Sequence, residues 1–173
     1  MSARTRRQFA DIVRRDPVDI GLACMLIAAE VEPELDPGRE LARFDVLAGD
    51  AGGLLGITPS EVSATGDGPA AGPPIGPAAR RTLAGLDVRT AAEILRETLG
   101  TRAGFHGDAG DFDSLHASLL ASVLRRRHGL PILLSIVWTE VAHRLCVPAY
   151  PIGMPGHVIV GVGSPERRVL VDP

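Results

Sequence analysis

Residues 129–148, GLPILLSIVWTEVAHRLCVP, decide the fold because they combine a helix start, a long apolar helix and a helix stop. Pro131 is a favoured first residue of a helix, and Pro148 cannot continue one. Apolar side chains recur over a wide helical face, so the helix is predicted to lie buried at the centre of the fold. That face consists of Ile132, Leu133, Ile136, Val137, Val141 and Leu145.

Three short segments after this helix are predicted to be strands, at residues 148–153, 157–162 and 167–172. The last two are rich in valine and are separated by a four-residue turn at 163–166. We therefore expect an antiparallel hairpin at the end of the chain.

The register of this hairpin determines which side chains meet. If Val162 lies opposite Arg167, then His157 lies directly opposite Asp172. Such partners on one face have Cβ atoms about 5 Å apart, which places an imidazole and a carboxylate within hydrogen-bonding reach.

Further helices are predicted before residue 129. Asp-Pro pairs at 16–17 and 36–37 are helix starts, and we expect the second helix to stop at Gly49. Thr90 forms a capping box with Glu93 and begins a helix that stops at Gly100. Ser114 could cap the next helix, which ends in the arginine run 125–127.

The chain divides into three parts. Residues 1–48 are predicted to be an N-terminal helical region, residues 49–81 a Gly/Pro-rich linker or loop, and residues 82–173 the core. The predicted fold class is α+β, with an N-terminal helical segment followed by helices packed on a small antiparallel sheet.

Composition excludes several functions. All 18 basic residues are arginine, so a lysine nucleophile or Schiff base is excluded. A net charge of -3 argues against a nucleic-acid partner, and no apolar run is long enough to span a bilayer. Cys24 and Cys146 lie far apart in the sequence, which suits a reducing compartment, and we expect a cytoplasmic protein.

A central helix followed by a His strand and an Asp strand resembles the transglutaminase-like core, within the papain-like class of cysteine hydrolases and transferases. The resemblance implies a Cys nucleophile at the helix N-terminus, a His general base and an orienting Asp. His157 and Asp172 occupy the His and Asp positions. Counting back from Leu145–Pro148, which looks like the family's Leu-Gly-Ile-Pro ending, places Pro131 at the nucleophile position.

The sequence resembles more closely the bacterial SirB family of transglutaminase-like proteins. That family has an Arg-rich helix end before Gly-Ile-Pro-Ile-x-Leu-Ser, then Pro-Gly-His and a late Asp-Pro. The corresponding segments here are residues 125–135, 154–157 and 171–173. The likeness is good from about Glu93 to Pro173 and weaker over 17–48.

The sequence departs from the SirB pattern in three places. Ala117, Ser118 and Ala121 stand where that family carries an Asn-Ser and a further Asn. The Gly/Pro-rich segment is unusually long. The family continues past Asp-Pro with Phe-Asn-Gly-Gly, whereas this chain stops at Pro173, so we expect a fragment or a short form.

Other reactive side chains are expected to be structural. Ser135 is considered as a surrogate nucleophile but is expected to be structural, because a helix-interior Ser usually bonds a carbonyl one turn back. Cys24 and Cys146 are expected to be buried and inert. The acidic and histidine residues of the loop before the central helix are expected to be solvated rather than to bind a metal. These are His106, Asp108, Asp111, Asp113 and His116.

The leading functional hypothesis is a non-catalytic transglutaminase-like module that binds a protein partner or a small ligand at its degenerate cleft, with no cofactor or metal. One alternative is a hydrolase or acyltransferase acting on amide or ester bonds with His157 as general base. Another is a purely structural or regulatory interaction protein, in which His157 and Asp172 only support the core. The arginine run 125–127 is expected to be solvated, although it could contact phosphate or an acidic partner.

Overall fold

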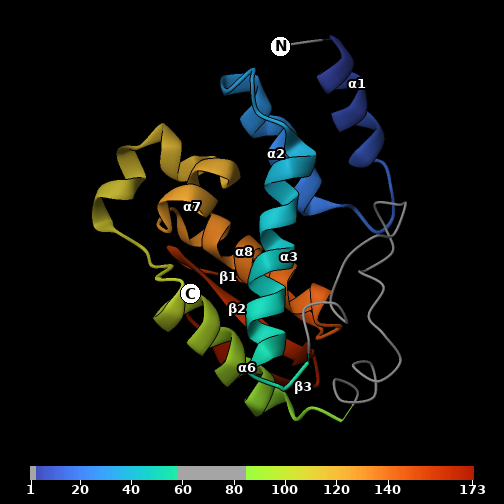
Figure 1. Ribbon diagram of the computed structural model, residues 1–173. Coiled ribbons are helices and arrows are strands. Elements are labelled where there is room, and N and C mark those ends of the chain that lie inside the picture. Colours follow the sequence, from blue (N-terminus) through green and yellow to red (C-terminus); the bar gives the residue numbers. More distant parts are fainter. Residues whose placement is uncertain (1–2, 58–84) are drawn as a thin grey trace.

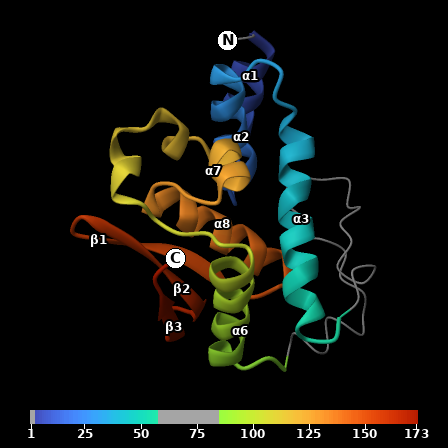
Figure 2. The same cartoon turned by 60° about the vertical axis from the view of Figure 1, so that its left-hand side comes forward.

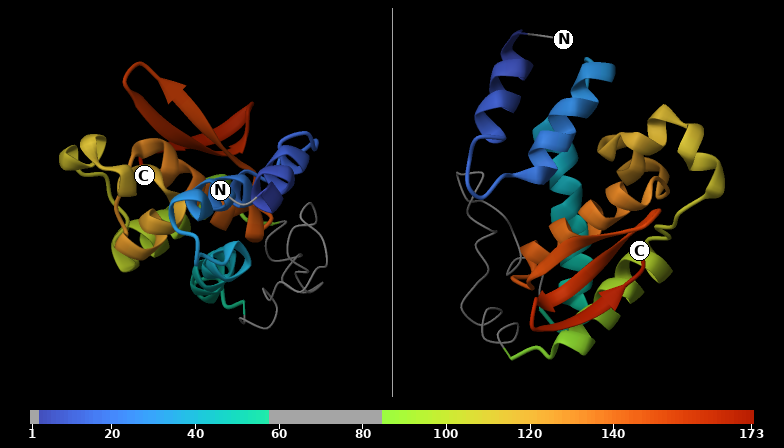
Figure 3. Two further views of the ribbon diagram at one scale, coloured as in Figure 1. Left: turned by 90° about the horizontal axis from the view of Figure 1, so that it is seen from above. Right: turned by 180° about the vertical axis from the view of Figure 1, so that it is seen from behind.

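A computed structural model describes residues 3–57 and 85–173 of the chain. The fold is α+β: a small antiparallel sheet lies on one side, a helical layer on the other, and one helix runs between them. Viewed from above, the strands and helix α3 lie on opposite sides of this central helix (Figure 3). The predicted fold class is confirmed.

The central helix is α8 (Pro131–Arg144). Its buried residues point in every direction around the helix axis, from Leu133 and Leu134 through Trp138 to Val141 and Ala142. A helix that is apolar all round must be covered on all sides, and here the sheet covers one face and the helical layer the other (Figure 1). The central position predicted for this segment is confirmed.

The sheet has the order β1 (Ala149–Met154), β2 (His157–Ser164) and β3 (Arg167–Val171), and both pairings are antiparallel. Ser164 pairs with Arg167, so the second turn has two residues rather than the predicted four. Val162 consequently lies opposite Val169, and the predicted register is wrong by two residues. Gly163, which pairs with Arg168 just before the turn, has φ +106, a backbone conformation that glycine adopts without steric cost.

The N-terminal part contains α1 (Ala3–Ile12), α2 (Ile20–Val31) and α3 (Pro37–Gly53). Asp36 caps α3 as predicted, but α2 begins later than predicted, with Asp19 rather than Asp16 as the N-cap accepting from the Leu22 N–H at 2.9 Å. α3 also continues beyond Gly49, because Phe44, Leu47, Ala48 and Ala51 keep one of its faces in the core.

The segment before the central helix is less regular than predicted. It contains α6 (Val88–Leu95), the π-helix η1 (Arg96–Arg102), the 3-10 turns η2 (Ala109–Asp113) and η3 (Leu115–Ser118), and α7 (Leu120–Arg126). Asp87, not Thr90, caps α6 by accepting from the Arg89 N–H. The predicted helix start at Ser114 is a short 3-10 turn, in which Leu115 is exposed.

Most of the Gly/Pro-rich segment lies outside the described residues. The described part of it, residues 49–57, contains the last turn of α3 and then Ile57, which packs in the core. The main core joins α2, α3, α6, α7, α8 and the sheet, so the N-terminal helical region and the C-terminal part share one core.

A substitution at Gly129 tests how closely the residues before α8 pack against α7 and η3. An added Cβ would lie 2.3 Å from Val123 Cγ2 and 3.1 Å from the Ala117 carbonyl oxygen. We expect Gly129→Ala to lower the free energy of unfolding by about 1–3 kcal/mol, because overpacking displaces the start of α8. Chemical denaturation followed by circular dichroism measures this.

Gly49→Ala is the matched control, since Gly49 lies inside α3 and a Cβ added there would meet nothing within 4 Å. It should be neutral or stabilising by up to about 1 kcal/mol. Equal effects of the two substitutions would contradict the close packing assigned to Gly129.

Candidate functional site

The start of α8 is the first component of the candidate site. Leu130 has extended backbone angles and is the N-cap, and Pro131 occupies the first turn. The Leu130 N–H donates to the Ala117 carbonyl at 3.1 Å, which fixes the start of α8 against the end of η3. Proline lacks an N–H and suits this position, where an N–H would have no partner within the helix. It carries no nucleophilic atom.

The second component is the pair formed by His157 and Asp172. His157 Nε2 lies 2.7 Å from Asp172 Oδ1, so the contact predicted from the hairpin is present. It forms through a different geometry: Val160 pairs with Val171, which makes His157 and Asp172 diagonal rather than directly opposite. Diagonal neighbours on one face remain within reach of side chains of this length.

The pair is open to solvent, with 39% of the His157 side chain and 69% of the Asp172 side chain exposed. Because Asp172 engages Nε2, the Nδ1 atom of His157 is the ring nitrogen left to face another group. When the imidazole is neutral and Nε2 carries the proton, Nδ1 accepts a hydrogen bond. The arrangement can therefore bind a donor or remove a proton.

The two components lie on the same side of the molecule. In Figures 1 and 2 the turn between β1 and β2, which leads into His157, lies toward the end of the molecule where α8 begins. The opposite end of α8 leads into β1 at Ala149. The fold thus brings a helix N-terminus and a His–Asp pair to one edge.

A sequence model described as the transglutaminase-like superfamily matches residues 75–173, which is more than half of the chain. The chain belongs to the transglutaminase-like superfamily. The resemblance inferred from the His and Asp strands is confirmed at this level.

Two groups of relatives support the assignment of this transglutaminase-like chain. It is 27% identical to a UPF0162 protein of Pseudomonas aeruginosa over 171 residues, which cover 97% of this chain and 51% of that protein. It is 32% identical to UPF0162 proteins from two strains of Xylella fastidiosa over 72 residues, or 42% of this chain and 26% of each relative. The chain thus spans about half or less of the length of these relatives. No solved structure matches significantly.

Ser135, weighed above as a surrogate nucleophile, lies inside α8 with its hydroxyl engaged. Its side chain is fully buried within α8, and its hydroxyl donates to the Ile132 carbonyl at 2.7 Å. This is the back-bonding that the sequence predicts for a serine inside an apolar helix.

The two cysteines differ in accessibility. Cys24 packs partly buried against the core, and burial raises the pKa of its thiol to about 11. Cys146 is exposed, so the prediction of a buried thiol is wrong there. It directly follows the C-cap of α8 and has a left-handed φ of +54, so the chain leaves the helix at this residue.

The loop before α8 contains a second His–Asp pair that sequence reasoning missed. Asp111, only 4% exposed at its side chain, accepts from His128 Nδ1 at 2.9 Å, and His128 stacks on His106 with ring centroids 5.7 Å apart. The prediction of a solvated loop is therefore wrong for Asp111. No local sequence signal predicts this pair, because the two side chains meet only where the loop folds back toward residue 128.

The remaining polar residues of this loop have structural partners. Asp108 accepts from the Gly110 N–H at 2.8 Å, and His116 Nδ1 lies 3.3 Å from the Ser122 hydroxyl. Over residues 3–57 and 85–173, no three His, Cys, Asp or Glu side chains gather closely enough to hold a metal ion. In the same ranges no helix is long and apolar enough to cross a membrane.

Thiol labelling tests the assignment of the cysteines. At pH 8 we expect Cys146 to react rapidly with a disulfide reagent, because it is exposed. Cys24 should react far more slowly, since with a pKa of about 11 only about one thiol in a thousand is ionised. Mass spectrometry of partly labelled protein identifies which cysteine has reacted. Preferential labelling of Cys24 would contradict the burial of its thiol and the exposure of Cys146.

Proposed function

We propose that this protein is a non-catalytic transglutaminase-like protein of the SirB type, which binds a partner or a small ligand at a degenerate cleft. The cleft would lie between the start of α8 and the His157–Asp172 pair. The observation that carries the proposal is Pro131 in the first turn of α8, at the position assigned by resemblance to the nucleophilic Cys.

The electrostatics of this edge support recognition rather than covalent chemistry. The N-terminus of a 14-residue helix carries partial positive charge, and no side chain caps α8. The imidazole of His157 and the carboxylate of Asp172 add an exposed acceptor and an anion. A ligand with both hydrogen-bond donors and acceptors would complement this edge, and no covalent intermediate is needed for binding.

The same proposal covers the setting of the protein. We infer a cytoplasmic location, supported by two cysteines that are both free thiols. We also keep the division into an N-terminal region at 1–48, a linker or loop at 49–81 and a core at 82–173. The chain spans about half the length of its Pseudomonas relative. The partner that we propose is therefore a partner of the region spanned by this chain, and a longer protein could bind others.

The second candidate is a hydrolase or acyltransferase that uses His157 as a general base. The 2.7 Å bond between His157 and Asp172 favours it, because a carboxylate that orients an imidazole is the arrangement used to activate water or a hydroxyl. It requires an attacking group supplied by solvent or substrate.

A hydrolysis assay distinguishes the two. We expect the intact protein to show no turnover above background on a panel of amide and ester substrates, at pH 6 to 9. Turnover that falls at least tenfold in His157→Ala, with Ser164→Ala as the matched surface control, would overturn the non-catalytic proposal.

A fragment screen by two-dimensional NMR tests binding at the cleft. Fragments that bind there should shift the backbone amides of Leu130, Ile132 and His157, and Asp172→Asn should weaken the binding. If shifts cluster elsewhere and none falls on these amides, the cleft is not the binding site.

A further inference from the structure

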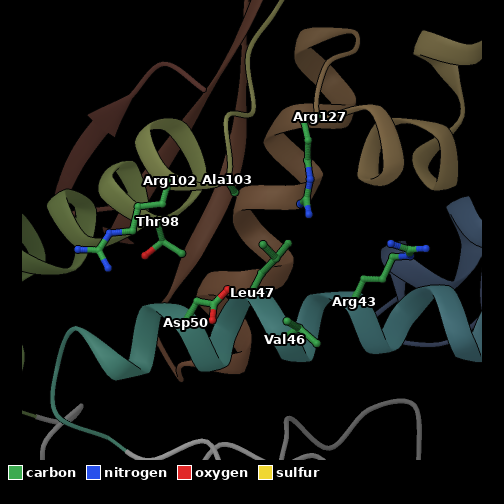
Figure 4. A pocket seen from close by; sticks show the side chains of 8 residues that line it. All are labelled: Arg43, Val46, Leu47, Asp50, Thr98, Arg102, Ala103 and Arg127. Atoms are coloured by element: carbon green, nitrogen blue, oxygen red, sulfur yellow. The ribbon is translucent and has the colours of Figure 1, made fainter.

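A cavity of about 550 Å³ lies away from the His157–Asp172 pair, between α3 and the segment formed by η1 and the end of α7. Its size is within the range of sites for small organic molecules. Neither His157, Asp172 nor Pro131 lines it. The lining residues are Arg43, Val46, Leu47, Asp50, Thr98, Arg102, Ala103 and Arg127 (Figure 4).

The three arginines of this cavity are not equivalent. Arg43 Nε lies 2.8 Å from Glu40 Oε2, and Arg102 Nε lies 3.1 Å from Glu97 Oε1. The positive charge of each of these arginines is therefore paired with a neighbouring carboxylate. Arg127 has no ion pair with any carboxylate that the structure describes. In Figure 4 its side chain points from the end of α7 toward α3, into the space above Leu47.

Arg127 is held in place although no carboxylate of residues 3–57 and 85–173 forms an ion pair with it. Its guanidinium lies 4.8 Å from the centre of the Phe105 ring, a stacking arrangement that orients the cation. Its backbone is left-handed, with φ +68, at the C-cap of α7, where glycine is the usual residue. Burial and the nearby charge of Arg43 lower the pKa of Arg127, and the charge of Asp50 only partly offsets them.

Thr98 supplies an independent observation. The residue is 1% exposed, and its hydroxyl has no hydrogen-bond partner among the residues that the structure describes. Buried hydroxyls are nearly always bonded, so an orphaned one beside a cavity indicates a missing partner. Figure 4 shows the Thr98 hydroxyl directed toward α3, on the side of the cavity where Asp50 also points inward.

We propose that this cavity binds a small organic carboxylate, with Arg127 and the Thr98 hydroxyl holding the carboxylate group. Val46, Leu47 and Ala103 contact an apolar body of the ligand. Asp50 accepts from a donor group, such as an ammonium or a hydroxyl, on the same molecule.

The charge balance decides between a carboxylate and a phosphate. With Arg43 and Arg102 paired, the cavity offers one free cation, Arg127, among the described residues, and one facing anion, Asp50. A single negative charge matches Arg127, whereas a phosphate dianion would be repelled by Asp50. If the ligand also carries an ammonium or a hydroxyl, that group donates a hydrogen bond to Asp50, and the interaction of Asp50 with the ligand becomes favourable.

Two-dimensional NMR titration with four probes tests the proposal: leucine, 4-methylpentanoate, leucinamide and inorganic phosphate. Leucine and 4-methylpentanoate should shift the amides of Thr98, Ala103 and Arg127, with leucine binding more tightly because of Asp50. Leucinamide, which lacks the carboxylate, and phosphate should bind at least tenfold more weakly than leucine.

Variants assign the contacts. Arg127→Gly should fold, because glycine suits the left-handed position, and it should weaken leucine binding at least tenfold. Thr98→Val should weaken both carboxylates several-fold, and Asp50→Asn should weaken leucine but not 4-methylpentanoate. Arg126→Gln, a neighbouring arginine outside the cavity, is the matched control and should change nothing.

Three results would overturn the proposal. One is the absence of shifts at these amides with either carboxylate up to about 10 mM, the weak limit of specific recognition. The second is equal binding of leucinamide or phosphate. The third is unchanged leucine binding in Arg127→Gly that is shown by circular dichroism to be folded.

Discussion

The burial of α8 from both sides is the constraint on which the rest of the structure depends. Trp138, Val137 and Leu134 have almost no exposed surface, so the sheet and the helical layer must both close over this one helix. Polar contacts then set its orientation. Arg144 Nε lies 2.7 Å from Asp45 of α3, and Glu140 accepts from the Gly21 N–H of α2 at 3.1 Å. The start of α8 is consequently fixed at the edge where β2 begins.

The sequence predicted this architecture because the decisive signals are local. The apolar periodicity of residues 131–145, the valine-rich strands and the proline at the helix start each act within a few residues. The predicted hairpin register was wrong by two residues because Gly163 and Ser164 continue the ladder instead of belonging to the turn. The His157–Asp172 contact was nevertheless predicted, since a shift of two residues keeps both side chains on the same face.

The missed features depend on tertiary packing. Asp111 is buried because the loop folds back so that His128 can reach it, and no local pattern reports such a contact. The arginine run divides in the same way: Arg125 bonds Glu32 of the α2–α3 connection at 2.7 Å, while Arg127 turns toward the cavity beside α3. The arginine run, which the sequence predicted to be solvated, therefore contains one residue in an ion pair, Arg125, and one stacked on an aromatic ring, Arg127.

The central proposal is that the start of α8 and the His157–Asp172 pair form a degenerate site in which Pro131 stands at the position that the resemblance assigns to the thiol. Alkylation of Pro131→Cys in a background without Cys24 and Cys146 measures this directly. The account predicts a rate with iodoacetamide at pH 7 about tenfold or more above that of Cys146 in the parent protein, because a helix N-terminus and a neighbouring imidazole stabilise a thiolate. That rate should fall when His157 is replaced by Ala. A Pro131→Cys thiol that reacts no faster than Cys146, in a variant that remains folded, would contradict the account.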